Sequence, residues 1–107
     1  MIKIAPSILS ADYASLGSAV DVLADWGANY VHLDVMDGAF VPNITFGAPM
    51  TKALRPHTEL VFDAHLMVEN PSKWVQPFKE AGANIVTIHV EADKHAHRTL
   101  QLIRSLG

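Results

Sequence analysis

Four short apolar segments, each followed by a helical pattern, constrain the fold of this chain most strongly. The predicted strands cover residues 2–9, 29–36, 60–67 and 85–91. Each segment is rich in Val and Ile or alternates apolar with polar residues, as strands do. A strand followed by a helix, repeated along the chain, predicts an α/β fold with a parallel sheet and right-handed crossovers.

The segments between the strands have the spacing and end signals of helices. Helices are predicted over residues 16–24, 48–54, about 71–81 and 97–105. Gly27 follows the first of them as a stop signal. Asn70 is expected to cap the third helix, with Pro71 at its first position. The chain therefore contains four strand–helix units of one kind.

Alternate residues of the predicted strands fall on two faces of different character. One face is apolar, with Ile2, Ile4, Val31, Leu33, Val35, Phe62, Leu66, Val86, Ile88 and Val90. The other face is mixed, and its polar groups lie mostly toward the carboxyl ends of the strands. A doubly wound sheet would cover both faces with helices, whereas a barrel has helices outside only. The mixed face favours a barrel lumen with an active site at its C-terminal mouth.

The length of the chain limits how much of a barrel it can form. A complete (β/α)8 TIM barrel typically has ~250 residues and eight units. This chain has 107 residues and four units, without a low-complexity linker. We therefore predict one domain, residues 1–107, that forms half of a TIM barrel: four parallel strand–helix units with helices on one face.

Composition excludes several functional classes. The formal net charge is −3 and there is no Lys/Arg-rich run, so no nucleic-acid partner is expected. The apolar stretches are strand-length, which excludes a membrane span, and the N-terminus does not resemble a signal peptide. Cysteine is absent, which excludes thiolate metal sites and Cys nucleophiles. A cytoplasmic location is the resulting expectation.

Three residues on the mixed face are candidate metal ligands. His32 and Asp34 point the same way from one predicted strand, and His65 is placed comparably on the next. Neighbouring strands are ~4.8 Å apart, so these side chains can converge. Their nitrogen and oxygen donors suit zinc, iron, manganese or cobalt. Met36 and Met67, one step further along each strand, would form an apolar collar. Histidines packed in the core are the alternative.

Other polar residues on this face have less specific interpretations. His89 and Glu91 share the orientation of the candidate ligands, and either support them from outside or are polar lumen residues. Lys3 and Asp63 are expected to form an ion pair at the bottom of the lumen. His95, which precedes the last predicted helix, is expected to lie in a solvated loop.

Several motifs together carry a resemblance to a known family. The segments "IAPSILSADYASLG", "VHLDVMDGAFVPNITFG", "DAHLMVENP" and "AGANIVTIHVEA" resemble ribulose-phosphate 3-epimerase, in family order and spacing. The resemblance implies a (β/α)8 barrel that interconverts D-ribulose 5-phosphate and D-xylulose 5-phosphate in the pentose phosphate pathway. A related epimerase of allulose 6-phosphate shares these motifs, so the resemblance leaves the sugar phosphate open.

The resemblance also implies roles for individual residues. The family binds one divalent metal through two histidines and two aspartates, and His32, Asp34 and His65 match three of these ligands. Asp34 matches one of two catalytic acid/base groups. Four residues match positions at the substrate: Ser7, Met36, His65 and Met67.

This sequence departs from the family pattern after its fourth strand–helix unit. The second catalytic aspartate and the phosphate-binding loops belong to later strands, which this chain lacks. We therefore expect the N-terminal half of such an epimerase, a truncated form with little or no activity alone. The alternatives are a self-assembling half-barrel without turnover and a homodimer that rebuilds a catalytic barrel. A homo-oligomer joined through the exposed strand edges is expected.

Overall fold

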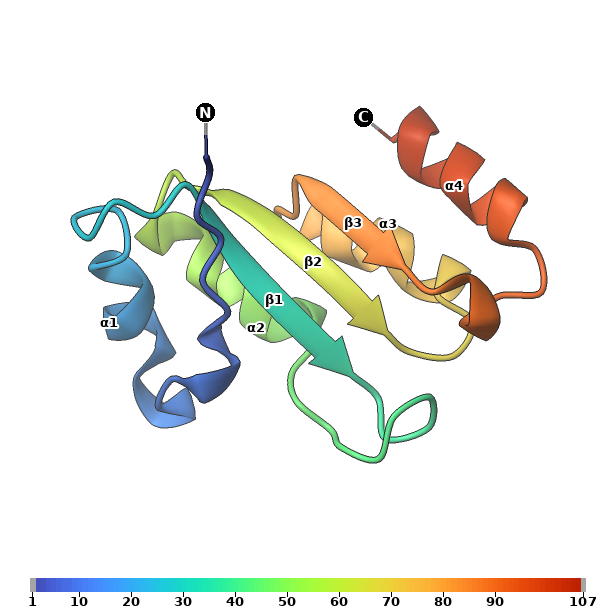
Figure 1. The fold of residues 1–107 in the computed structure, drawn as a ribbon, viewed down its shortest axis with the longest axis horizontal. Coiled ribbons are helices and arrows are strands. Elements are labelled where there is room, and N and C mark those ends of the chain that lie inside the picture. The colour runs from blue at the N-terminus through green and yellow to red at the C-terminus, as the bar shows by residue number, and fades with distance from the viewer. Residues whose placement is uncertain (1, 107) are drawn as a thin grey trace.

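The computed structural model describes residues 2–106 and contains a parallel sheet of three strands in the order β1-β2-β3 (Figure 1). The strands are β1 (Tyr30–Met36), β2 (Val61–Met67) and β3 (Ile85–Ile88). The helices are α1 (Leu16–Asp21), α2 (Ala48–Leu54), α3 (Ser72–Glu80) and α4 (Ala96–Ser105). The predicted α/β class with parallel strands is confirmed, and the sheet formed by residues 2–106 does not close.

One face of the sheet is buried and the other is not. Val31, Leu33, Phe62 and Leu66 are fully buried, and α2 and α3 lie behind the sheet in Figure 1. The alternate residues of β1 and β2 are only partly buried. The strand alternation therefore correctly predicted part of a barrel with helices behind one face of the sheet. No helix within residues 2–106 is long and apolar enough to cross a membrane.

The register of the sheet aligns the polar residues of neighbouring strands. His32 pairs with Asp63, and Asp34 pairs with His65. Met36 and Met67 are also register partners, at the ends of the two strands. Because directly opposed residues share a face, the register alone brings these side chains together at the carboxyl end of the sheet.

The first predicted strand is not a regular strand. Residues of this segment run beside β1, but only an isolated bridge between Ser7 and His32 is formed. The carbonyls of Ile4 and Pro6 accept backbone hydrogen bonds from residues 29, 30 and 32. The Ile4 N–H instead donates to the Asn29 side chain, and Pro6 has no N–H. A full ladder to β1 is therefore missing from the described part of this segment.

Three other predicted boundaries are wrong. The last strand ends at Ile88, and residues 90–92 form a 3-10 turn. Helix α1 ends at Asp21, before the predicted end at residue 24. Helix α3 begins after Pro71, whereas Asn70 has a positive φ of 49°. Asn tolerates this left-handed conformation well, so Asn70 ends the preceding loop and does not cap the helix.

Arg55, directly after α2, links the helix layer to two loops. Its guanidinium lies 3.8 Å from the centroid of the Phe62 ring. It donates to the carbonyls of Thr58, Leu60 and Gly82 at 2.8, 2.6 and 3.0 Å. The planar fork of donors allows one side chain to satisfy several carbonyls at once. This contact joins the entry to β2 with the turn that precedes β3.

Candidate metal and catalytic site

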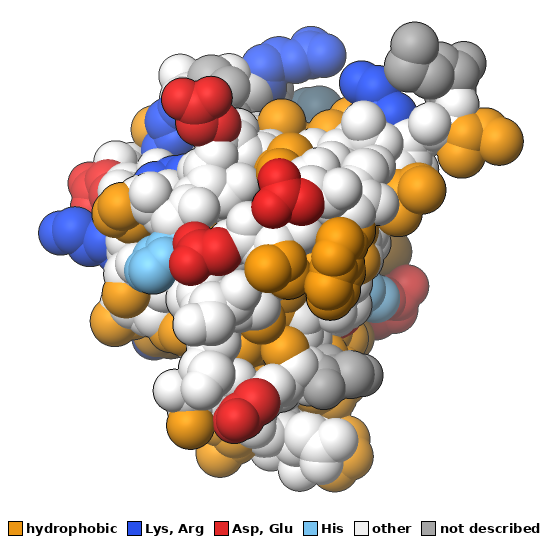
Figure 2. Space-filling view, turned by 90° about the vertical axis from the view of Figure 1, so that its left-hand side faces the viewer, with side chains coloured by type: hydrophobic (Ala, Val, Ile, Leu, Met, Phe, Trp, Pro, Cys, Tyr) orange, Lys and Arg blue, Asp and Glu red, His pale blue; other side chains and the backbone are white. Residues whose placement is uncertain are grey.

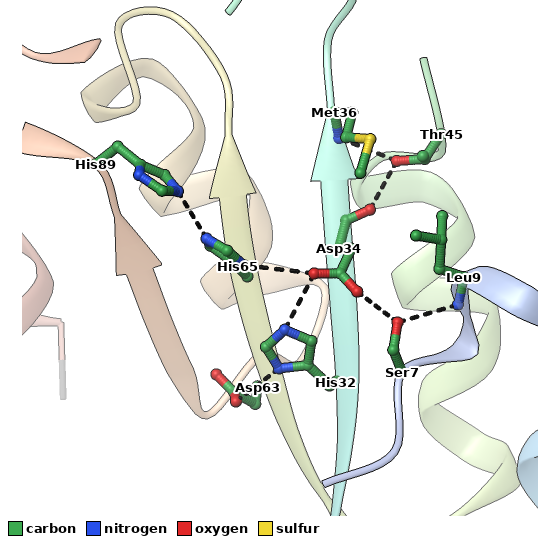
Figure 3. Close-up of polar contacts among 9 residues, drawn as sticks. All are labelled: Ser7, Leu9, His32, Asp34, Met36, Thr45, Asp63, His65 and His89. Atoms are coloured by element: carbon green, nitrogen blue, oxygen red, sulfur yellow. Dashed lines mark hydrogen bonds and ion pairs between the residues drawn. The ribbon is translucent and has the colours of Figure 1, made fainter. Parts of the chain in front are cut away.

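Three side chains meet on the open face of the sheet, at its carboxyl end (Figure 3). His32, Asp34 and His65 each offer one donor atom, and these atoms lie within 4.8 Å of one another. The side chains are about a quarter exposed or less, at 24%, 16% and 25% respectively. The cluster is therefore reachable from solvent but largely enclosed.

Asp34 is at the centre of this cluster. Its Oδ1 lies 3.1 Å from His32 Nε2 and 3.3 Å from His65 Nδ1. Its Oδ2 accepts a hydrogen bond from the Ser7 hydroxyl. Burial by itself raises the pKa of Asp34, but the Ser7 hydrogen bond and the two histidines outweigh it and hold the pKa below its ordinary value. Asp34 is therefore an ionised carboxylate at neutral pH.

His32 is held from the side opposite Asp34 by a second carboxylate. Its Nδ1 lies 2.9 Å from Asp63 Oδ2. The expected ion pair between Lys3 and Asp63 is wrong, because the register places Asp63 directly opposite His32. Lys3 instead donates to the Tyr30 hydroxyl at 3.4 Å. The sequence interpretation missed the contact of Asp63 with His32. Asp63 and His65 are alternate residues of one strand and so share a face, which was a usable signal for this contact.

His65 is also contacted on the ring nitrogen that faces away from Asp34. Its Nε2 lies 2.7 Å from Nε2 of His89, and the two rings stack with centroids 4.9 Å apart. His89 follows β3, so three consecutive βα units contribute to one connected group. Glu91 lies beyond it, with Oε2 3.6 Å from His89 Nδ1.

The loop after β1 is fixed close to the cluster. Thr45 Oγ1 donates to the Asp34 carbonyl at 2.7 Å and accepts from the Met36 N–H at 2.9 Å (Figure 3). Met36 and Met67 are partly buried at the strand ends, beside the candidate ligands. The two methionines therefore lie next to the candidate ligands on the same face of the sheet.

Asp37 joins the loops that follow β1 and β2. Its Oδ1 accepts the N–H groups of Ala39 and Phe40, and its Oδ2 accepts the N–H of Glu69, each at 2.9 Å. Burial raises the pKa of Asp37, but these backbone donors more than offset it and the pKa is lowered. Asp37 thus positions the rim of the site and does not enter the cluster.

The donor set matches what a divalent metal of borderline hardness requires. Two imidazole nitrogens and one carboxylate oxygen converge, and each ring is held through its other nitrogen by a further polar group. Such outer contacts are typical of histidines that ligate metals. Parallel βα units with these groups toward the carboxyl ends of the strands are the arrangement found in part of a TIM barrel.

Comparison with known proteins agrees with this arrangement. The chain belongs to the ribulose-phosphate 3 epimerase family, whose family model matches residues 3–107. It is 52% identical over 107 residues to a ribulose-phosphate 3-epimerase of Bacillus subtilis (strain 168). It is 53% identical over 104 residues to that of Treponema pallidum (strain Nichols).

The matches cover nearly all of this chain but only part of each relative. The two bacterial matches span 100% and 97% of the chain, and 49% and 48% of the relatives. A cytoplasmic isoform from Oryza sativa subsp. japonica is 47% identical over 98% of the chain and 46% of its own length. The chain thus spans about half the length of the curated relatives it matches.

Proposed function

We propose that this chain supplies the metal-binding half, with one of two catalytic acid/base groups, of a ribulose-phosphate 3-epimerase. The observation that carries the proposal is the ionised Asp34 carboxylate, set between His32 and His65 on the open face of the sheet. A cytoplasmic location and a sugar-phosphate substrate are parts of the same proposal.

The chemistry of the reaction explains these residue types. Inverting C3 beside a ketone requires removal of a proton from one face and return of a proton to the other. Asp34 would accept or return the proton on one of these faces. A bound zinc, iron, manganese or cobalt ion would stabilise the negative charge that develops on the substrate oxygens. His32, Asp34 and His65 would hold that ion.

Neighbouring residues orient the carboxylate and enclose the substrate. Ser7 donates to Asp34 Oδ2, which leaves Oδ1 directed toward the two histidines. Met36 and Met67 would provide apolar walls that exclude water from the reacting carbons. His65 would contact the substrate as well as the metal. Each of these roles concerns residues at the carboxyl end of β1 or β2 or in the segment beside β1.

The substrate is proposed at the level of a ketose phosphate. Ribulose 5-phosphate is favoured because the two bacterial relatives are ribulose-phosphate 3-epimerases. Allulose 6-phosphate is the second candidate, because the cluster acts on the ketone and C3, which both sugars share. Comparing the rates with the two sugar phosphates, once a complementing half is supplied, distinguishes them.

A coupled assay of ribulose 5-phosphate epimerisation tests the catalytic proposal. We expect the chain alone to be slower than the Bacillus subtilis relative by at least ~10²-fold, since loss of one acid/base group typically costs 10² to 10⁴. Any residual turnover should disappear in Asp34→Asn. Turnover within about tenfold of the relative would contradict the proposed half-site. A chain without turnover or metal binding supports the second candidate, a structural half-barrel.

The proposed partner is a second copy of the chain, joined through the strand edges. Hydrophobic side chains are exposed toward both edges: Ile2 and Ile4 beside β1, and Ile85 and Leu100 on β3 and α4. Figure 2 shows hydrophobic and acidic side chains side by side on the face that carries α1. Exposed strand edges promote association of this kind.

A further inference from the structure

We propose that His89, supported by Glu91, is a positioning residue that selects which nitrogen of His65 faces the metal site. His89 would accept the Nε2 proton of His65, and the Nδ1 lone pair of His65 would then be free for the ion. This inference rests on the proposed function, because it concerns one of the candidate ligands. Neither His89 nor Glu91 is a ligand in this arrangement.

The geometry around His89 sets the direction of the hydrogen bond. The two Nε2 atoms of His65 and His89 lie 2.7 Å apart, so they share one proton (Figure 3). On the far side of the His89 ring, the Glu91 carboxylate lies 3.6 Å from Nδ1. The other ring nitrogen of His65, Nδ1, faces Asp34 in the cluster, so an ion bound there would take its lone pair and leave the ring proton on Nε2. The Nε2 of His89 is therefore the acceptor.

The consequence for His65 comes from the same rule. With its proton on Nε2, the neutral His65 ring presents a lone pair at Nδ1, 3.3 Å from Asp34 Oδ1. A cation between these two atoms would be held by both, in place of the contact that the metal-free ring makes with Asp34. The structure thus pairs the tautomer of His65 with the position of the proposed ion.

His32 is also contacted by polar groups on both ring nitrogens, but the nitrogen that faces Asp34 is Nε2 and not Nδ1. Its Nδ1 contacts Asp63, and its Nε2 faces Asp34. One histidine would thus ligate through Nε2 and the other through Nδ1. The His89 ring is itself held in place, because it stacks on His65 and lies 5.2 Å from the Phe40 ring by centroids.

The test uses zinc and three variants of the chain. His89→Phe keeps a ring but removes the acceptor, whereas His89→Gln retains a side-chain oxygen that can accept. His95→Ala, outside the cluster, is the control. Zinc affinity is measured by competition with a chelating dye. We expect His89→Phe to weaken binding about 10- to 100-fold, His89→Gln to recover most of the loss, and His95→Ala to bind like the unchanged chain.

A spectroscopic measurement on the unchanged chain tests the inference without a variant. In the zinc-loaded protein, ¹⁵N NMR of the His65 ring should show Nδ1 bound to the ion and Nε2 protonated. Zinc bound through Nε2 of His65, or equal affinity in His89→Phe, overturns the role of His89 and leaves the proposed function intact. A folded chain that binds no zinc overturns both the role of His89 and the proposed function. If His89→Phe does not fold, the NMR assignment decides.

Discussion

At Asp34, three segments far apart in the sequence meet at one carboxylate: the segment before η1 (Ile8–Ser10), β1 and β2. Asp34→Asn keeps the shape of the side chain but removes its charge. We expect zinc or cobalt affinity to fall by more than about tenfold, since an amide is a far weaker ligand than a carboxylate. Isothermal titration of the metal-free chain measures the change.

The matched comparison for this prediction uses two histidines. His65→Ala should weaken metal binding as Asp34→Asn does, whereas His95→Ala should leave it unchanged, because His95 lies outside the cluster. Unchanged affinity in Asp34→Asn would contradict the assignment. Equal losses in His65→Ala and His95→Ala would instead place the metal among histidines of the last loop.

For single residues, strand parity, that is, the alternation of strand residues between two faces, predicted the face of each side chain but not its partner. Parity placed His32, Asp34 and His65 on one face, and the structure places their donor atoms together. Parity does not specify which acidic group reaches which base. Lys3 and Asp63 share that face, but the Lys3 side chain reaches Tyr30, and Asp63 lies opposite His32. Register decides such pairs, and it is fixed only when the strands pair.

At the scale of elements, the turn between α3 and β3 requires a glycine for two reasons. Gly82 has a φ of 107°, and a Cβ there would lie 2.3 Å from Arg55 Cδ. Gly82→Ala should therefore destabilise the chain by about 1–3 kcal/mol from backbone strain alone, with a further loss from displacement of Arg55. Urea unfolding followed by circular dichroism measures the free energy of unfolding.

Gly27 offers a control in which the steric contact is absent. Its φ is 88°, but a Cβ there would have no neighbour within 4 Å. Gly27→Ala should show the cost of the backbone conformation only, so Gly82→Ala should be the more destabilising of the two. Equal losses in the two variants would mean that Arg55 moves aside without cost.

The start of α4 makes the stability of the chain depend on pH. Asp93 accepts hydrogen bonds from the Thr99 hydroxyl and, at 2.9 Å, from the His95 N–H. The Thr99 bond and then the His95 bond lower the pKa of Asp93, against the opposing effect of burial. A carboxylate with a lowered folded-state pKa stabilises the chain above its unfolded pKa, about 3.9. That stabilisation is lost as pH falls through the folded value.

Asp93→Asn isolates this contribution. The amide retains one oxygen acceptor but does not titrate, so the wild-type advantage in unfolding free energy should be largest near neutral pH. It should shrink as pH falls below about 4. Urea titrations of both proteins across this range give the difference directly. A difference that does not change with pH would show that the charge of Asp93 contributes nothing.

The helix–strand order was more predictable than the element ends. Apolar periodicity together with end signals identified the four α-helices and the three regular strands within residues 2–106, because burial of one face determines the apolar pattern. The ladder of the first segment could not be predicted, since the Asn29 side chain takes the N–H of Ile4. A positive φ at Asn70 likewise depends on the path of the loop before α3.

At the scale of the whole molecule, the apolar groups near the edges predict association. Size-exclusion chromatography with light scattering at micromolar concentration should show a dimer or a larger species. Leu100→Glu places a charge on the exposed face of α4 and should shift the chain toward monomer. Ile44→Glu changes a more exposed residue in the loop after β1, and this variant should not shift the chain toward monomer. A folded wild-type monomer would contradict the proposed partner.

The contacts of Asp34 all lie within a continuous stretch of sequence, from Ser7 to His65, and His89 extends the group by one unit. In a relative twice as long, this stretch leaves the ribosome before the remainder has been synthesised. Because residues 2–106 bring these groups together without any later segment, the cluster can assemble on the nascent chain. Metal capture would then precede completion of the barrel, and the later half would close over a site already formed.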